Sequence, residues 1–440
     1  MATSVRAFGW AGLLAIAVGA MLSWRPLLLC ALVLAALFVW GLWTAERLNY
    51  TLFAVLFLVP VTVDPGYPAS PVWTVLLTAT AIALLGRLQR FHPDAPVVSA
   101  GMIAFVLPAA CLVAGLVRWS GPQALLVSLL PFVCYALITW HLVAEASRDP
   151  AVPERLARAF SWVGVPVALL AIYQRATGTW PVLDALATTI AFTSGAGSGR
   201  SVGTMGHPIV YGTFCMMTMC VALGLRGRLW PVPFAAGAVG AVLSGSRSAW
   251  IGTVAVLVLW YLAHRPKLTR RGVYLLVAFL VAGGGLAAFG PRPVRATIGF
   301  VGARLSNLTG SSSATARYRR TAAALSGIRE SVASVLVGRG PEAHVRFFQQ
   351  VGISDRLAQT FDNSYLTLWY DFGLVALLIF VLLLAGVFVS LRSLTARMLI
   401  VGFAVQIWFF DFYLWPCAAA TLILAVGLAV GGRVRNGGRA

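Results

Sequence analysis

The chain has 440 residues, of which 60% are hydrophobic and only 10% are charged. This composition is typical of an all-α, polytopic membrane protein and argues against a water-soluble globular domain. The net charge of +20 does not indicate a nucleic-acid partner, because the basic residues are scattered between hydrophobic segments and not gathered in one domain.

Hydrophobic segments follow one another along most of the chain, and several are short for a full span. They lie at about 8–23, 26–43, 49–63, 70–86, 98–117, 122–143, 157–174, 208–225, 230–244, 248–263, 272–289, 363–390, 398–410 and 412–431. Because short segments can pair or re-enter, we expect about twelve to fourteen transmembrane helices. The pattern divides the chain into N-terminal transmembrane helices (1–289), a hydrophilic loop (290–361) and C-terminal transmembrane helices (362–440).

Basic residues predict how these helices are oriented. When the segments alternate between two faces, most arginines fall on one face, whereas the short loops of the other face carry few. The few are Arg25, Arg118, Arg175, Arg200 and Arg247. By the positive-inside rule, the arginine-rich face is cytoplasmic and both termini lie inside. The first segment lacks a small-residue cleavage site and is predicted to be a span, not a signal peptide.

Cysteines and acidic residues are not spaced for a metal site. All six cysteines fall within hydrophobic segments, and their spacing fits neither a zinc site nor a disulfide framework. The acidic residues predicted to face outward are dispersed and include no tight carboxylate pair. We therefore expect neither a metal nor another cofactor.

Two arginines at the ends of hydrophobic segments are the strongest site candidates. Arg200 begins the string Arg-Ser-Val-Gly-Thr-Met-Gly-His-Pro, and Arg247 lies in Ser-Gly-Ser-Arg-Ser-Ala-Trp. A guanidinium near hydrocarbon is costly unless it is paired or lines a polar cavity, and its fork suits phosphate oxygens. Gly203 and Gly206 allow close backbone approach to a ligand. His207 either caps the next helix or takes part in the site. Together these residues predict a site for a phosphorylated lipid.

The loop at 290–361 is predicted to form a strongly cationic cap on the outer face. It carries ten arginines and three acidic residues, a net charge of +7. We expect one helix that begins near residues 311–313 and ends at Gly338, because its apolar positions recur at three and four residues. These positions are Tyr318, Ala322, Leu325, Ile328, Val332 and Val335. A second helix should follow Pro341 and carry His344. The alternative is a lid whose arginines meet lipid phosphates without specificity.

In order and spacing, these motifs resemble the O-antigen ligase and O-antigen polymerase superfamily of bacterial inner-membrane glycosyltransferases. The resemblance covers about residues 195–390 and includes the layout of spans with one large loop late in the chain. The matching pieces are the two arginine strings, Arg317 through Gly338-x-Gly340, Asn363-Ser-Tyr-Leu366 and Gly373.

The family implies transfer of a glycan from undecaprenyl diphosphate at the periplasmic face of the bacterial inner membrane, without a metal or a nucleotide sugar. The ligase branch uses lipid A–core oligosaccharide as acceptor, whereas the polymerase branch uses another repeat unit. We expect a ligase, because the chain resembles that branch in length and in its arginine-rich loop. A transporter such as a flippase is the alternative from another class, although no internal repeat supports it.

The resemblance assigns roles to further residues. Arg200 and Arg247 would stabilise the leaving diphosphate, while Arg317, Arg339 and Asn363 would contribute to substrate binding. Family members commonly carry a histidine directly before the residue that matches Asn363, and here that position is an aspartate.

Two residues therefore compete for the role of base. Asp362 occupies the position of the family's histidine, but the neighbouring arginines favour an ionised, paired carboxylate there. A histidine is poised to exchange a proton near neutral pH, and His344 is therefore ranked slightly above Asp362 as the base. Asp411, an acid among aromatic residues near the outer end of two late segments, is a candidate for substrate binding. Asp371, in Tyr-Asp-Phe-Gly, is interpreted as structural.

Overall fold

The computed structural model describes residues 44–58, 95–181, 200–264, 299, 302, 312–353, 359–390, 393–412 and 415–437; the side chains of 45, 95–101, 312–317, 390 and 433–437 lie outside this description. Within these ranges the structure is helical and contains no strand, which confirms the all-α prediction. The helices are α3 (Ala45–Leu58), α5 (Ala95–Val117), α6 (Pro122–Arg148), α7 (Val152–Thr177), α9 (Pro208–Gly224), α10 (Pro231–Ser244), α11 (Arg247–His264), α14 (Ser312–Ile328), α15 (Val332–Val337), α16 (Ala343–Gln350), α17 (Ser364–Ser390), α18 (Leu394–Gln406) and α19 (Pro416–Gly437).

Several of these helices have the length and composition of membrane spans. In the described part of the chain, three are long and apolar enough to cross a bilayer: α6, α7 and the segment Ser364–Val389 of α17. Shorter apolar helices, including α9, α10 and α18, pack beside them. Large apolar side chains on α5 such as Met102 (67% exposed) and Val113 (61% exposed) point away from the protein, as expected for a surface in contact with lipid. The chain is thus a helical membrane protein.

One end of the helix bundle gathers segments that the charge pattern predicted to be cytoplasmic. Arg155 Nε, near the start of α7, lies 2.9 Å from Glu46 Oε1 in α3. The side chain of Thr395, at the start of α18, packs against Gly224 at the end of α9. The loops that join these helices therefore share an end, as the sequence predicted. Which side of the membrane they face stays a prediction.

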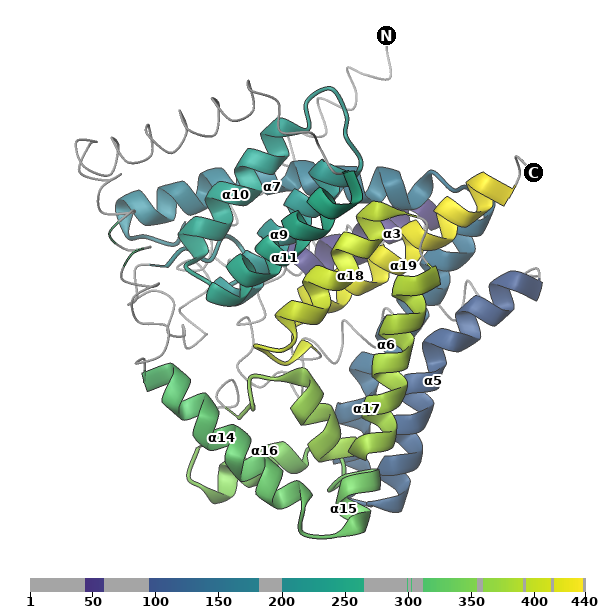
Figure 1. Cartoon of the computed structure of the whole chain (residues 1–440), viewed down its shortest axis with the longest axis vertical. Coiled ribbons are helices and arrows are strands. Elements are labelled where there is room, and N and C mark those ends of the chain that lie inside the picture. The colour runs from purple at the N-terminus through teal and green to yellow at the C-terminus, as the bar shows by residue number, and fades with distance from the viewer. Residues whose placement is uncertain are drawn as a thin grey trace, which may run out of the picture.

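The described part of the hydrophilic loop (290–361) folds into three helices around the start of α17, at the lower end of the view in Figure 1. The expected single helix to residue 337 is wrong, because α14 ends at Ile328 and the hydroxyl of Ser331 then caps α15 by accepting from Ser334 N (3.0 Å). Val332 and Val335 thus lie on a separate helix. The expected second helix is present as α16. A buried apolar cluster joins the loop to α17 through Ala324, Ile328, Ala343, Phe348, Phe361, Leu366 and Tyr370.

Glycines allow the loop and α17 to approach backbone to backbone. Gly373 interrupts α17 with φ 84° and ψ 175°, in the region that favours glycine. Beside this kink, Arg339 N donates to Tyr370 O (2.8 Å) and Gly340 N donates to Asp371 O (3.0 Å). A Cβ on Gly373 would overlap the carbonyl of Leu336. The Gly-x-Gly motif and Gly373 are therefore two halves of one contact.

Candidate active site

The segment 200–207 is held in a defined path by buried hydrogen bonds. Ser201 N donates to Leu243 O at the end of α10 (3.0 Å), and Ser201 Oγ donates to Ala171 O in α7 (2.8 Å). The buried amide of Gln174 accepts from Gly203 N (3.0 Å) and donates to Gly203 O (2.7 Å). These contacts attach the segment to α7 and α10 without using the Arg200 guanidinium.

Arg200 and Arg247 flank the same turn. Arg200 Nε donates to Ser244 O, the last residue of α10 (2.8 Å). Gly245 then takes a left-handed conformation (φ 57°) that ends α10, and α11 begins at Arg247. Both arginine side chains are half-buried. The structure thus brings the two predicted arginines to one turn, which we call the arginine cluster (residues 200–207 and 244–250).

His207 acts as a helix cap in this cluster. It precedes α9, and its Nδ1 accepts from Ile209 N (3.3 Å). Burial, assisted by the nearby charge of Arg200, lowers the pKa of His207 to about 3, so the ring is neutral at ordinary pH. Gly203 (φ 57°) and Gly206 (φ 72°) both adopt the left-handed conformations that the preceding turn requires. Of the two roles left open by the sequence, the structure shows the cap.

A second cluster is built around His344, which lies on α16 with only 4% of its surface exposed. Asp371, from α17, holds it with both carboxylate oxygens: Oδ1 accepts from the backbone N of His344 (2.9 Å), and Oδ2 lies 2.6 Å from Nδ1. With the carboxylate as acceptor, Nδ1 carries the proton and Nε2 is the ring nitrogen able to take another. The Gly-x-Gly contact described above places Asp371 for this bond.

Asp411 is, after Asp371, a second buried carboxylate of the same region. It lies between α18 and α19 with 1% of its surface exposed. The Thr360 hydroxyl donates to its Oδ2, whereas Oδ1 has no hydrogen-bond partner among the described residues. Burial raises the pKa of Asp411 to about 6, against the opposing hydrogen bonds from Thr360 and Thr367. The nearby charges of His344 and Asp362 also act on this carboxyl group, His344 lowering its pKa and Asp362 raising it. We call His344, Asp371, Asp411, Thr360 and Asp362 the histidine–carboxylate cluster.

Asp362 and Asn363 have positions fixed by local contacts. Asp362 adopts φ 54°, and its backbone N donates to Thr360 Oγ1 (3.0 Å). Its carboxylate lies 3.5 Å from Arg320 Nη1, so Asp362 is paired as the surrounding arginines led us to expect. Asn363 Oδ1 accepts from Leu366 N (3.1 Å) in the first turn of α17. Asn363 is thus a helix cap beside the cluster.

The two loop arginines predicted to bind substrate differ in what the structure shows. Arg339 Nη1 lies 2.7 Å from Glu330 Oε2 and 3.0 Å from Gly327 O, and the guanidinium lies over the ring of Tyr370 (5.6 Å). These contacts tie α14 to α17. Arg317 lies on α14, and its side chain falls outside the described residues.

The loop between α18 and α19 connects the two clusters. At one end, Ser364 N donates to Ile407 O (2.9 Å), and Asp411 follows in the histidine–carboxylate cluster. At the other end, the Trp415 ring lies 4.6 Å from the His207 ring in the arginine cluster. A single short segment therefore contacts both groups of predicted residues.

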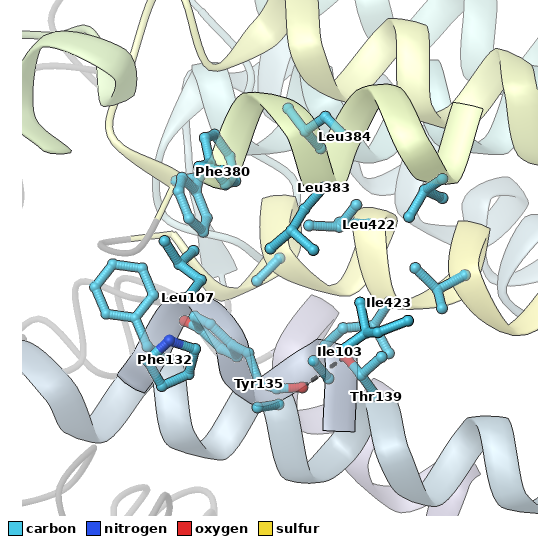
Figure 2. Close-up of a pocket in the computed structure, with 17 residues that line it drawn as sticks. Ile103, Leu107, Phe132, Tyr135, Thr139, Phe380, Leu383, Leu384, Leu422 and Ile423 are labelled. Carbon is cyan, nitrogen blue, oxygen red and sulfur yellow. Dashed lines mark hydrogen bonds between the residues drawn. The ribbon is translucent and has the colours of Figure 1, made fainter. Parts of the chain in front are cut away.

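An apolar cavity of about 130 Å³ opens beside this loop, between α5, α6, α17 and α19. Its lining includes Phe132, Phe380 and Phe412, and continues along the helices to Leu383 and Thr139 (Figure 2). Phe412 directly follows Asp411, so the cavity begins next to the histidine–carboxylate cluster. Its surface suits a hydrocarbon chain.

Sequence reasoning missed three contributors. Asp371, interpreted as structural, holds His344; Thr360 joins Asp411 to Asp362; and Gln174 supports the Arg200 segment. For Asp371 a signal was available, since an acidic residue within a span is a functional candidate by default. As for metals, the described residues contain no group of three or more His, Cys, Asp or Glu side chains placed to hold an ion.

Comparison with known protein families gives a match. Residues 232–381 match the model of the O-antigen ligase family, which confirms the resemblance seen in the sequence. This range contains Arg247, His344, Asp362 and Asp371, while Arg200 and Asp411 lie outside it. A comparison with curated proteins gave no match.

Proposed function

We propose, from the premise that residues 232–381 place the chain in the O-antigen ligase superfamily, that it is an O-antigen ligase. It would transfer O-antigen polysaccharide from undecaprenyl diphosphate to lipid A–core oligosaccharide, at the periplasmic face of a bacterial inner membrane. Both termini would then be cytoplasmic. The observation that carries this proposal is the contact of one loop, through Asp411 and Trp415, with both clusters. The reaction needs such a pairing of cationic and proton-accepting groups.

The arginine cluster is suited to hold the diphosphate. Arg200 and Arg247 are half-buried at one turn, and each guanidinium can give two parallel hydrogen bonds to phosphate oxygens. The N-terminus of α11, which begins at Arg247, adds the positive end of its helix dipole. Negative charge that develops on the leaving diphosphate would therefore meet cations already in place.

His344 is the base that the geometry supports best. The acceptor hydroxyl oxygen would attack the anomeric carbon of the donor glycan, and its proton would pass to Nε2 of His344. The bond between that carbon and the diphosphate oxygen breaks, and the electron pair leaves with undecaprenyl diphosphate. Asp371 fixes the ring through Nδ1 and stabilises the imidazolium that forms. Because His344 is buried, neighbouring loop side chains must move apart when the acceptor enters.

Asp362 would then orient groups and not act as the base. Its pairing with Arg320 favours a carboxylate that keeps its charge. Asp411 Oδ1 is placed to accept a hydrogen bond from a sugar hydroxyl, because it has no partner among the described residues. The apolar cavity beside Phe412 would hold a hydrocarbon chain of a lipid substrate, since it begins one residue from Asp411. Neither a metal nor another cofactor takes part in this scheme.

Reconstitution of the purified protein tests the proposal. The protein would be placed in vesicles with glycan-loaded undecaprenyl diphosphate and, in separate reactions, with lipid A–core oligosaccharide or a second repeat unit. Glycan-bearing lipid A–core is the expected product, and excess chelator should not reduce its yield. Longer glycan on undecaprenyl diphosphate would instead identify a repeat-unit polymerase. Movement of the lipid across the bilayer without any new glycosidic bond would identify a flippase and overturn the proposal.

A further inference from the structure

A second pocket lies at the end of the bundle opposite the candidate active site. It has a volume of about 290 Å³ and is formed by α7, α9 and the loop between α9 and α10. Its lining includes Arg158, Ser161, Trp162, Arg228, Leu229 and Trp230. The capping residue His207 marks the other end of α9, whose 17 residues span roughly 25 Å at 1.5 Å per residue. The pocket is therefore separate from both clusters.

The lining of this pocket is cationic. Arg158 and Arg228 both contribute to it, and none of its lining residues is acidic. Arg158 is 56% exposed, and its Nη2 lies 3.6 Å from Glu154 Oε2 on its own helix. Arg228 is exposed. Arg158 and Arg228, on different elements, thus line one hollow that an anion can enter.

Aromatic and aliphatic side chains complete the pocket. Trp162 is 43% exposed and Leu229 is 58% exposed, although both lie beside a hollow in the protein surface. Trp230 supports the guanidinium of the neighbouring Arg226, which lies 5.8 Å from its ring and 5.1 Å from the ring of Trp260. Tryptophan beside arginine at the end of apolar helices is typical of the headgroup level of a membrane.

We propose that this pocket binds the headgroup of an anionic glycerophospholipid. The lipid phosphate would lie between Arg158 and Arg228, and the glycerol and upper acyl chains would lie against Trp162 and Leu229. Basic pockets between transmembrane helices recognise anionic headgroups in this way. A soluble anion would gain the two guanidinium contacts but not the apolar ones. The site is thus built for a lipid, and its occupation is independent of glycan transfer.

Native mass spectrometry of the full chain, released from vesicles of phosphatidylglycerol and phosphatidylcholine, tests this site. We expect phosphatidylglycerol to remain bound and phosphatidylcholine to be lost. Each of R158Q and R228Q should weaken retention about fivefold, and the double variant about twenty-five-fold, from the energy typical of one arginine near an anionic headgroup. R148Q is the matched control, because Arg148 is 57% exposed and pairs with Glu145 at 3.5 Å, outside the pocket. It should retain lipid as the unchanged protein does.

Three results would overturn the proposal: equal retention of the two lipids, equal loss in R148Q, or displacement of the lipid by millimolar glycerol 3-phosphate. Equal retention of the two lipids would show that headgroup charge does not select the lipid. Equal loss in R148Q would show that the lipid does not bind at this pocket. Displacement by glycerol 3-phosphate would show that the acyl chains do not contribute to binding. If the double variant does not insert, R228Q alone decides the question, because an exposed arginine is not needed for folding.

Discussion

The two clusters of the candidate site are built in different ways. In the arginine cluster, neutral groups such as Gln174 and Ser201 position the backbone, and the charged side chains of Arg200 and Arg247 are left half-buried at a turn. In the histidine–carboxylate cluster, the chemical groups themselves, His344 and Asp371, are almost fully buried and bond each other.

This difference separates two tasks. A cation that meets a diphosphate must stay accessible, and its attraction acts over several ångströms, so its surroundings only need to hold the backbone in place. A base must have one protonation state and one orientation, and a buried carboxylate partner provides both. The arginine cluster should therefore keep its function after small displacements of its side chains, whereas the histidine–carboxylate cluster should not.

Loss of a guanidinium should have the largest effect. We expect R200A and R247A each to reduce glycan transfer about 100- to 1,000-fold, because each removes a donor to the developing charge. Initial rates in reconstituted vesicles would measure this. R329A is the control, since Arg329 is an exposed loop arginine outside both clusters. Near-normal rates in both R200A and R247A would exclude the leaving-group role.

Removal of the base should have the next largest effect. H344A should lower the rate about 100-fold, the lower end of the range typical for general-base catalysis. D371N should lower the rate nearly as much as H344A, because the amide can no longer stabilise the imidazolium. D371N should also change the shape of the pH–rate profile. D362N should cost less than about tenfold, since Asp362 only orients neighbours. If D362N is worse than H344A, the assignment of the base is reversed.

The pH dependence of Asp411 provides a finer test. Since burial raises its pKa to about 6, the carboxylate is protonated below that pH and ionised above it. Sugar binding by the ionised form predicts that activity falls below pH 6. D411N should remove the part of this fall that comes from Asp411, while the part that comes from protonation of the base remains. Because the pKa is raised in the folded protein, stability falls as pH rises from about 4 to 6. At pH 7 the free energy of unfolding of D411N should therefore exceed that of the unchanged protein by up to about 3 kcal/mol. Lower stability of D411N at pH 7 would contradict this burial effect.

The smallest effect is expected from a substitution at the backbone contact that positions Asp371 beside His344. G373A should lower the free energy of unfolding by about 1–3 kcal/mol, because alanine is strained at φ 84° and its Cβ overlaps Leu336 O. Thermal unfolding in detergent would show it. G386A is the matched control on the same helix, where a Cβ meets no atom within 4 Å. Equal melting temperatures for the two variants would mean that the contact is loose.

The sequence was sufficient for properties that depend on composition and local pattern. Hydrophobic runs predicted an all-α membrane protein, and the runs at α9 and α17 were placed within a residue or two. The ordered motifs predicted the family that residues 232–381 match. The helix boundary at Ile328 was missed, because the apolar spacing continues through the break and only the cap at Ser331 ends it.

Tertiary structure decided which residues meet. Asp371 and His344 are 27 positions apart, and their 2.6 Å contact depends on a kink at Gly373 that no periodicity reveals. Trp415 reaches His207 across more than 200 positions, through the way α9 and α19 pack. Residue pattern determines which surface each helix buries, but the partner of a polar side chain depends on distances between segments far apart in the chain, and these are set only when the helices pack.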